Sequence, residues 1–138
     1  LYSLHKLLGM VILVLVIFRL AYRIRNGAPK DEPTLEPWQK GASHATHWGL
    51  YALLILMPIG GWVGVSLYGA REIFGLFSLP AITAQDQAAA ARVFFLHMLG
   101  GFAIAGLIAA HVGAAIFHHF IRKDGVLRRM LPGIGKRD

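Results

Sequence analysis

The stretch FFLHMLGGFAIAGLIAAHVGAAIFHHF, residues 94–120, decides the fold of this chain. It contains no Asp, Glu, Lys or Arg, and it exceeds the roughly 20 residues that an α-helix needs to cross a bilayer at about 1.5 Å per residue. The same stretch carries four histidines, His97, His111, His118 and His119. A polar ring in hydrocarbon costs free energy, so each of these histidines requires a structural or chemical reason.

Two further segments resemble this stretch in composition, and together the three predict membrane-spanning helices at about residues 2–25, 41–68 and 92–121. Apolar residues make up 56% of the 138 residues and charged residues 15%, against about 45–50% and 25% in ordinary globular domains. We therefore predict an all-α membrane protein, in which residues 1–138 form one transmembrane up-and-down helical bundle. The chain has no cysteine, which excludes disulfides, iron–sulfur clusters and thiolate metal sites.

Lys and Arg side chains are distributed unequally between the two ends of the predicted bundle. Three lie at the end that includes the N-terminus, namely Lys6, Arg71 and Arg92. Ten lie near the loop 26–40 or in the tail 122–138: Arg23, Arg25, Lys30, Lys40, Arg122, Lys123, Arg128, Arg129, Lys136 and Arg137. Because cytoplasmic segments carry the excess of positive charge, we expect this loop and the tail to be cytoplasmic. The formal charge of +7 is accordingly attributed to a membrane surface rather than to nucleic acid.

The orientation has a consequence for the start of the chain. If the loop 26–40 is cytoplasmic, Leu1 lies outside, although the first residues of this sequence do not have the pattern of a signal peptide. We therefore expect a further span before Leu1, so that three helices of an expected four are present in this sequence.

The histidines of the third span follow a helical repeat. His97 and His111 are 14 residues apart, which places them on one face of a helix, about 21 Å apart along its axis. His118 follows seven residues later on the same face. His5 begins the first span at a depth similar to that of His97, and Arg19 lies 14 residues after His5, level with His111.

Two imidazoles at one depth on neighbouring helices are a suitable pair of axial ligands for a haem iron, which suits electron transfer. The pattern predicts such a pair in His5 and His97, and it predicts His111 as a ligand whose partner is not evident in this sequence. Packing histidines or a proton or metal transporter are the alternatives, but a transporter usually uses intramembrane carboxylates, which the spans lack. We expect His44 and His47 to lie at the membrane interface. The alternative is that one of them contacts a haem propionate or serves as a haem ligand.

Several segments carry a resemblance to a known family: SLHKLLGMVILVLVIFRLAYRIRN, GASHATHWGLYALLILMPIGG, FFLHMLGG and AAHVGAAIFHHFIRKDGVLRRMLP. With the spacing of His97 and His111 and the pair of histidines that follows, they resemble the bacterial cytochrome b561 family over essentially the whole chain. The resemblance implies a four-helix bundle of the bacterial inner membrane that binds two b-type haems. It implies that His5 and His97 hold one haem. It implies that the other haem is held by His111 and by a histidine of the family's first helix, which this sequence does not include.

The resemblance also implies a function. It indicates a quinone-linked oxidoreductase that carries electrons between an outer donor, superoxide in some members, and ubiquinone. It places the quinone near His118 and Lys123, and we expect Arg19 to pair with a haem propionate. The alternative is a cytochrome b subunit that anchors a hydrogenase-like or formate-dehydrogenase-like complex to the membrane.

Overall fold

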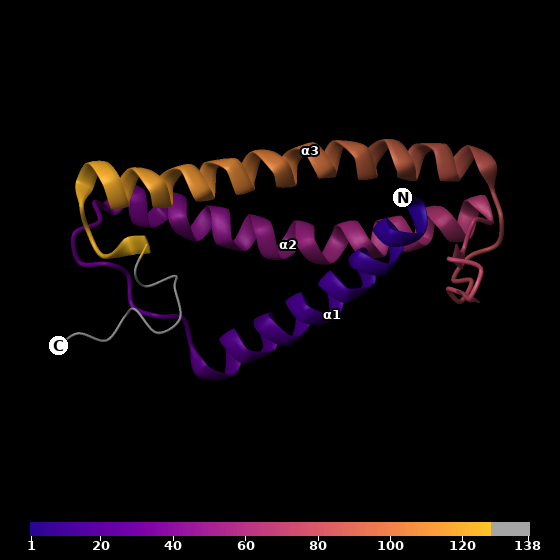
Figure 1. The fold of residues 1–138 in the computed structure, drawn as a ribbon, viewed down its shortest axis with the longest axis horizontal. Helices are drawn as coiled ribbons and strands as arrows, with labels where there is room; N and C mark the ends of the chain where they lie inside the picture. The colour runs from indigo at the N-terminus through magenta and orange to yellow at the C-terminus, as the bar shows by residue number, and fades with distance from the viewer. Residues whose placement is uncertain (128–138) are drawn as a thin grey trace.

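The computed structural model describes residues 1–127 as three long helices joined by two connections (Figure 1). The helices are α1 (Tyr2–Asn26), α2 (Pro37–Tyr68) and α3 (Gln87–Phe117). A five-residue π-helical turn, η1 (His118–Arg122), continues α3. Residues 128–138 lie outside the described residues, so that most of the predicted cytoplasmic tail and its cations Arg128, Arg129, Lys136 and Arg137 are not described.

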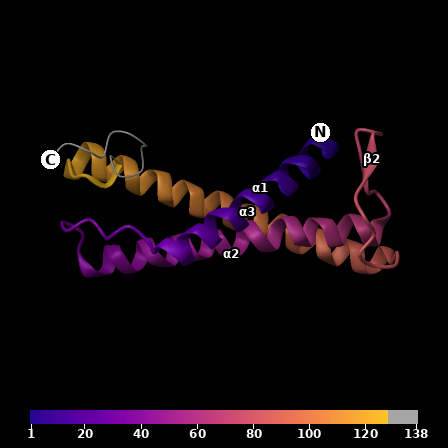
Figure 2. The same ribbon diagram turned by 90° about the horizontal axis from the view of Figure 1, so that it is seen from below.

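The three helices do not pack equally along their lengths. Figure 1 and Figure 2 show α2 and α3 side by side over most of their length, whereas α1 crosses them obliquely. α1 packs against α2 and against the strand pair of the connection 69–86, and its C-terminal end diverges from α3 in Figure 1. We call the end with the connection 69–86 the hairpin end, and the end with residues 27–36 and η1 the loop end.

Local signals in the sequence begin α2 and α3 earlier than the predicted spans. Glu36 and Gln39 form a capping box in front of α2, with Pro37 in its first turn. Asp86 caps α3, and its carboxylate accepts a hydrogen bond of 2.9 Å from the Ala89 N–H. These caps place the helix starts at residues 37 and 87 rather than 41 and 92, because hydropathy marks the membrane-embedded part of a helix and not its first turns.

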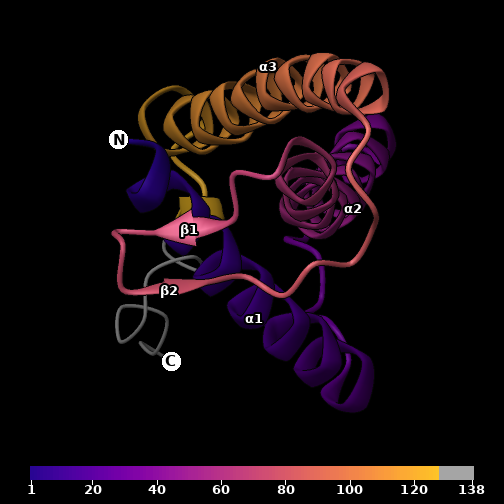
Figure 3. The same ribbon diagram turned by 90° about the vertical axis from the view of Figure 1, so that its right-hand side faces the viewer.

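The connection 69–86 contains the only strands within residues 1–127, the two-residue strands β1 (Glu72–Ile73) and β2 (Phe77–Ser78). They pair antiparallel, with Glu72 opposite Ser78 and Ile73 opposite Phe77. The turn between them has positive φ at Phe74 (52°) and Gly75 (70°), which is the backbone that tight hairpins require. Figure 3 shows that this hairpin crosses in front of α1.

Large apolar side chains cover the outside of the molecule, including Leu15, Phe18, Leu96, Phe102 and Ile121, each more than 60% exposed. The segments Tyr2–Asn26, Pro37–Tyr68 and Gln87–Arg122 are long and apolar enough to cross a membrane. Such a surface is stable only in contact with lipid or with other apolar surfaces. The predicted fold class, an all-α membrane protein with a transmembrane helical bundle, is confirmed.

Candidate functional site

Glycines set the register between the antiparallel helices α2 and α3. A Cβ atom on Gly61 would lie 3.0 Å from Cε1 of His97, and one on Gly64 would lie 2.6 Å from Cε1 of Phe94. In both pairs the residue numbers add up to 158. Glycine is therefore required where an aromatic or imidazole ring of α3 lies directly on the backbone of α2.

At the hairpin end, α1 and α3 bring His5 and His97 together. Their ring centroids are 5.8 Å apart and their planes are inclined by 80°. Two imidazoles that bind one metal ion from opposite sides at about 2 Å have ring centroids roughly 6 Å apart. The observed separation therefore fits a pair of axial ligands.

A cavity of about 840 Å³ lies among the three helices at this end, and both His5 and His97 line it. Its volume is within the range of roughly 300–1,000 Å³ that is typical of ligand and cofactor sites. The rest of the lining is mainly apolar or aromatic, and it includes Gly9, Met10, Pro58, Val65 and Phe94. A flat hydrophobic macrocycle is the kind of group that such walls accommodate.

One ring nitrogen of His97 lacks a hydrogen-bond partner among the described residues. The Nδ1 atom of His97 is buried and has no hydrogen-bond partner of good geometry within residues 1–127, although the Met57 backbone is close enough to interact with the ring. A buried polar atom without a partner is costly in a purely structural role. The residues at the hairpin end thus fit the haem that the sequence predicts.

The hairpin holds the beginning of α1 in place beside the cavity. The ammonium group of Lys6 donates hydrogen bonds to the carbonyl oxygens of Ala70 and Glu72, and Ser3 Oγ accepts one of 3.1 Å from the Phe74 N–H. Because His5 lies between Ser3 and Lys6 in the first turns of α1, these contacts fix the position of His5 relative to the hairpin.

At the loop end, His111 faces α2 instead of α1. The centroid of its ring lies 5.2 Å from that of the His47 ring, with the ring planes inclined by 65°. The residue numbers 47 and 111 again add up to 158. The glycine register therefore predicts this neighbour: His47 is 14 residues before Gly61 on α2, as His111 is 14 after His97 on α3. We did not single out His47 from the sequence as the neighbour of His111, since the hydropathy pattern carries no information on register.

A second cavity, of about 390 Å³, lies at the loop end between α2 and α3. His111 and His118 both line it, together with Trp38, Gln39 and Ser43 of α2. Two of the predicted site residues therefore share one cavity. Lys123, the other predicted quinone residue, is exposed and is not among the described residues that line it.

Arg19 lies in a group of basic and aromatic side chains between α1 and α2. Its Nε donates a hydrogen bond of 3.2 Å to the Tyr51 hydroxyl, and the guanidinium group of Arg23 lies over the rings of Trp48 and Tyr51 at 5.5 and 5.7 Å. Both arginines are close enough to interact electrostatically with His47. The structure therefore places Arg19 near the level of His111, but its contacts are with α2.

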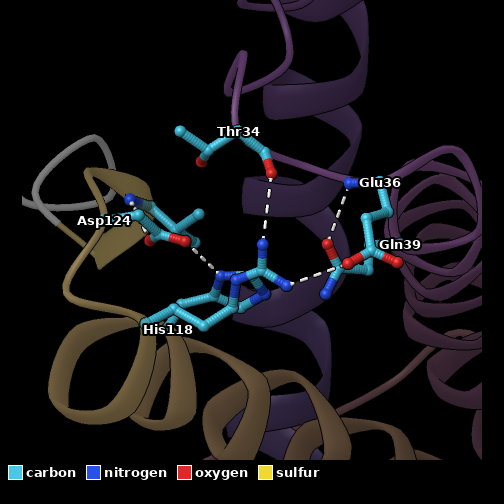
Figure 4. Close-up of polar contacts among 7 residues, drawn as sticks. Thr34, Glu36, Gln39, His118 and Asp124 are labelled. Atoms are coloured by element: carbon cyan, nitrogen blue, oxygen red, sulfur yellow. Dashed lines mark hydrogen bonds and ion pairs between the residues drawn. The ribbon is translucent and has the colours of Figure 1, made fainter.

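The π-helical turn brings Asp124 back to His118. Lys123 has a left-handed backbone, with φ of 53°, and the N–H groups of Lys123 and Asp124 both donate to the His118 carbonyl. The Asp124 carboxylate then lies 2.5 Å from Nδ1 of His118 (Figure 4), and both side chains are more than 90% buried. We did not select Asp124 from the sequence, because a fit to α-helical periodicity does not predict a π turn.

Two carboxyl groups at the loop end have lowered pKa values. Burial alone would raise the pKa of Asp124, but the hydrogen bonds from His118 and the Val126 N–H lower it, and the net pKa lies below its ordinary value. The indole of Trp38 and the guanidinium group of Arg122 lower the pKa of Glu36. Both carboxylates are accordingly ionised near neutral pH.

Glu36 and Arg122 also join the loop 27–36 to the end of α3. The Arg122 guanidinium donates to Glu36 Oε1 at 3.3 Å and to the Thr34 carbonyl at 3.4 Å (Figure 4). Because Glu36 is exposed, this ion pair contributes little to the free energy of folding.

Comparisons with known proteins agree with this arrangement. Residues 1–133 match the family model described as prokaryotic cytochrome b561. The chain is 33% identical over 130 residues to cytochrome b561 homolog 2 of Escherichia coli K12, covering 94% of this chain and 69% of that protein. It is 31% identical over 128 residues to cytochrome b561 homolog 1 of the same organism, covering 93% and 73%.

A third relative carries a more specific name. The chain is 34% identical over 130 residues to the protein named probable superoxide oxidase CybB of Yersinia pestis, covering 93% of this chain and 73% of that one. The family implies b-type haem. With three membrane-spanning helices and this match over nearly its whole length, the chain belongs to the prokaryotic cytochrome b561 family and is a multi-pass bacterial membrane cytochrome b of electron transfer.

Proposed function

We propose that this chain carries electrons between a donor at the hairpin end and the membrane quinone pool at the loop end. The observation that supports this most directly is the placement of one imidazole cavity at each end of the same helix. His97 lines the first and His111 and His118 line the second. The name of the CybB relative favours superoxide as the donor.

In this proposal His5 and His97 hold one haem b by their imidazole nitrogens. A haem held by these two imidazoles would supply one-electron redox chemistry. The apolar walls of the cavity exclude water from the ligands, and the contacts of Lys6 and Ser3 with the hairpin keep His5 opposite His97.

His111 would hold a second haem b. The resemblance implies that its partner is a histidine of the family's first helix. His47 lies on the α2 side, and its charged neighbours, His111, Arg23, His44 and Arg19, are all basic. Such a group attracts anions, which supports the pairing of Arg19 with a haem propionate.

Quinone, with ubiquinone as the expected form, would occupy the loop-end cavity beside His118. His118 would donate a hydrogen bond to a quinone oxygen and would supply a proton to it as a general acid. Lys123 would attract the anionic membrane surface or the ligand from outside the cavity. The excess of Lys and Arg at the loop end supports a cytoplasmic location for it, and hence an outer location for the hairpin end.

The function is tested by following electrons into quinone. Purified protein should show a reduced-minus-oxidised difference spectrum of b type, and oxidation by a soluble ubiquinone analogue should restore the oxidised spectrum. His118→Ala should slow that oxidation about tenfold or more while the haem content stays unchanged. Equal rates in the two proteins would contradict a quinone role for His118. A peripheral redox subunit that co-purifies with the chain and supplies its electrons would favour an anchor subunit instead.

A further inference from the structure

We propose that Asp124 is a positioning residue that fixes His118, so that its Nε2 is the nitrogen that exchanges a proton with quinone in the loop-end cavity. This inference rests on the proposed function, because it assigns the proton chemistry of the same site. It adds a residue that neither the sequence pattern nor the cavity lining indicates.

The geometry leaves only one nitrogen of His118 available. Nδ1 lies 2.5 Å from the Asp124 carboxylate, and a contact this short between a buried imidazole and an ionised carboxylate is a charge-assisted hydrogen bond. Since Nδ1–H is donated to Asp124, a ligand in the cavity has access to Nε2 alone. His118 is 7% exposed, so the ring has little freedom to turn over.

Backbone contacts hold the carboxylate in this position. Its second oxygen, Oδ1, accepts a hydrogen bond of 3.1 Å from the Val126 N–H, and the N–H of Asp124 itself donates to the His118 carbonyl at 3.2 Å. Both oxygens of the carboxylate thus have partners, and the side chain is 6% exposed. An aspartate that merely solubilised the end of a helix would point into water.

Proton transfer to quinone can use only the nitrogen that Asp124 leaves free. An imidazolium that gives Nδ1–H to Asp124 presents Nε2–H, the donor that a quinone carbonyl needs. When the quinone is reduced, that proton moves from Nε2 to the quinone oxygen, and the ring becomes neutral with its other proton still on Nδ1. Full reduction to quinol takes two electrons from the reduced cytochrome and two protons, of which Nε2 supplies one and solvent the other.

Other charged groups surround the pair and define the control. Arg122 of the same turn interacts with Asp124, Glu36 and Glu32 lie on the facing loop, and His111 shares the cavity. Of these, Glu36 is a carboxylate at the same end that contacts Arg122 but not His118. Glu36→Gln therefore removes a neighbouring negative charge without touching the His118–Asp124 pair.

The test measures oxidation of the reduced holoprotein by a soluble ubiquinone analogue. We expect Asp124→Asn to lower kcat about tenfold or more, while KM changes less; a positioned acid–base group itself contributes roughly 10²–10⁴-fold, and Asp124 acts only through such a group. Asp124→Glu, which keeps the carboxylate, should retain most of kcat, and Glu36→Gln should behave as the unmodified protein. The double variant His118→Ala/Asp124→Asn should be no slower than His118→Ala, because the two residues act as one unit.

Each outcome bears on a defined claim. If His118→Ala is slow and Asp124→Asn matches Glu36→Gln, the positioning role is overturned and the quinone role of His118 stands. If His118→Ala itself has normal kinetics, the proposed quinone function fails and the inference with it. If Asp124→Asn does not accumulate with normal haem content, Asp124→Glu becomes the deciding variant. A loss of kcat in Asp124→Glu as large as in His118→Ala then overturns the positioning role of Asp124.

Discussion

The hairpin end and the loop end of this bundle use the same 14-residue repeat of α3 but form different sites. At the hairpin end three helices meet, and His97 faces His5 across a cavity of about 840 Å³. At the loop end α1 has diverged, His111 faces His47 of α2 at 5.2 Å, and the cavity has about 390 Å³. The difference shows that a periodic histidine pattern on one helix does not determine the sites along it, because the neighbouring helix at each level supplies the opposing side chain.

The largest expected effect separates the two ends by removing a ligand. His97→Ala should abolish haem binding at the hairpin end, because one imidazole alone cannot form a six-coordinate iron, and total haem should fall by about one per chain. Haem per protein, measured from the absorbance of its pyridine complex, checks this. His119→Ala is the control, since the ring of His119 packs against Phe120 and His119 lines neither of the two cavities described above. Full haem content in His97→Ala would refute the ligand assignment.

A smaller effect is expected from the glycine contact at the hairpin end. Gly61→Ala places a methyl group 3.0 Å from Cε1 of His97, which displaces the ring by a few tenths of an ångström. We expect haem affinity to fall roughly fivefold, equivalent to about 1 kcal/mol. Titration of haem into haem-depleted protein measures the change.

Gly60→Ala is the matched control for this variant. A Cβ atom at Gly60 meets no atom within 4 Å, and both variants gain the same helix propensity from alanine. Equal haem affinities in the two variants would show that the close approach of His97 to α2 is not part of the site.

The smallest effect concerns the charge of Arg19. If Arg19 stabilises the reduced haem at the loop end, Arg19→Gln should lower that midpoint potential by roughly tens of millivolts, since 59 mV corresponds to about 1.4 kcal/mol for one electron. The haem at the hairpin end should keep its potential. A redox titration followed by absorbance resolves the two, and Arg25→Gln, at the exposed end of α1, is the control. A shift at the hairpin end alone would contradict the placement of Arg19.

The sequence predicted the fold class and the pairing of His5 with His97 at one level because hydropathy and helical periodicity are local properties. It did not predict that His47 lies beside His111, because this contact depends on the register between α2 and α3. That register is determined by tertiary contacts such as those of Gly61 and Gly64. The position of Asp124 depends on a π turn and a left-handed residue, and neither follows from the hydrophobic pattern.

The starts of α2 and α3, unlike the register between the two helices, could have been predicted from the sequence. The capping box of Glu36 and the Asp86 cap are readable in sequence. A boundary drawn from both caps and hydropathy would have matched both helix starts.

The contact between His118 and Asp124 depends on the number of residues in η1 as well as on the two side chains. A π turn accommodates one residue more than an α turn in the same hydrogen-bonded ring, and it is followed here by the reversal at Lys123. Shortening this turn by one residue would continue α3 as an ordinary helix and rotate everything beyond it by about 100°. Asp124 would then project to another side of the helix, so a deletion that spares every functional side chain would still separate the carboxylate from its imidazole.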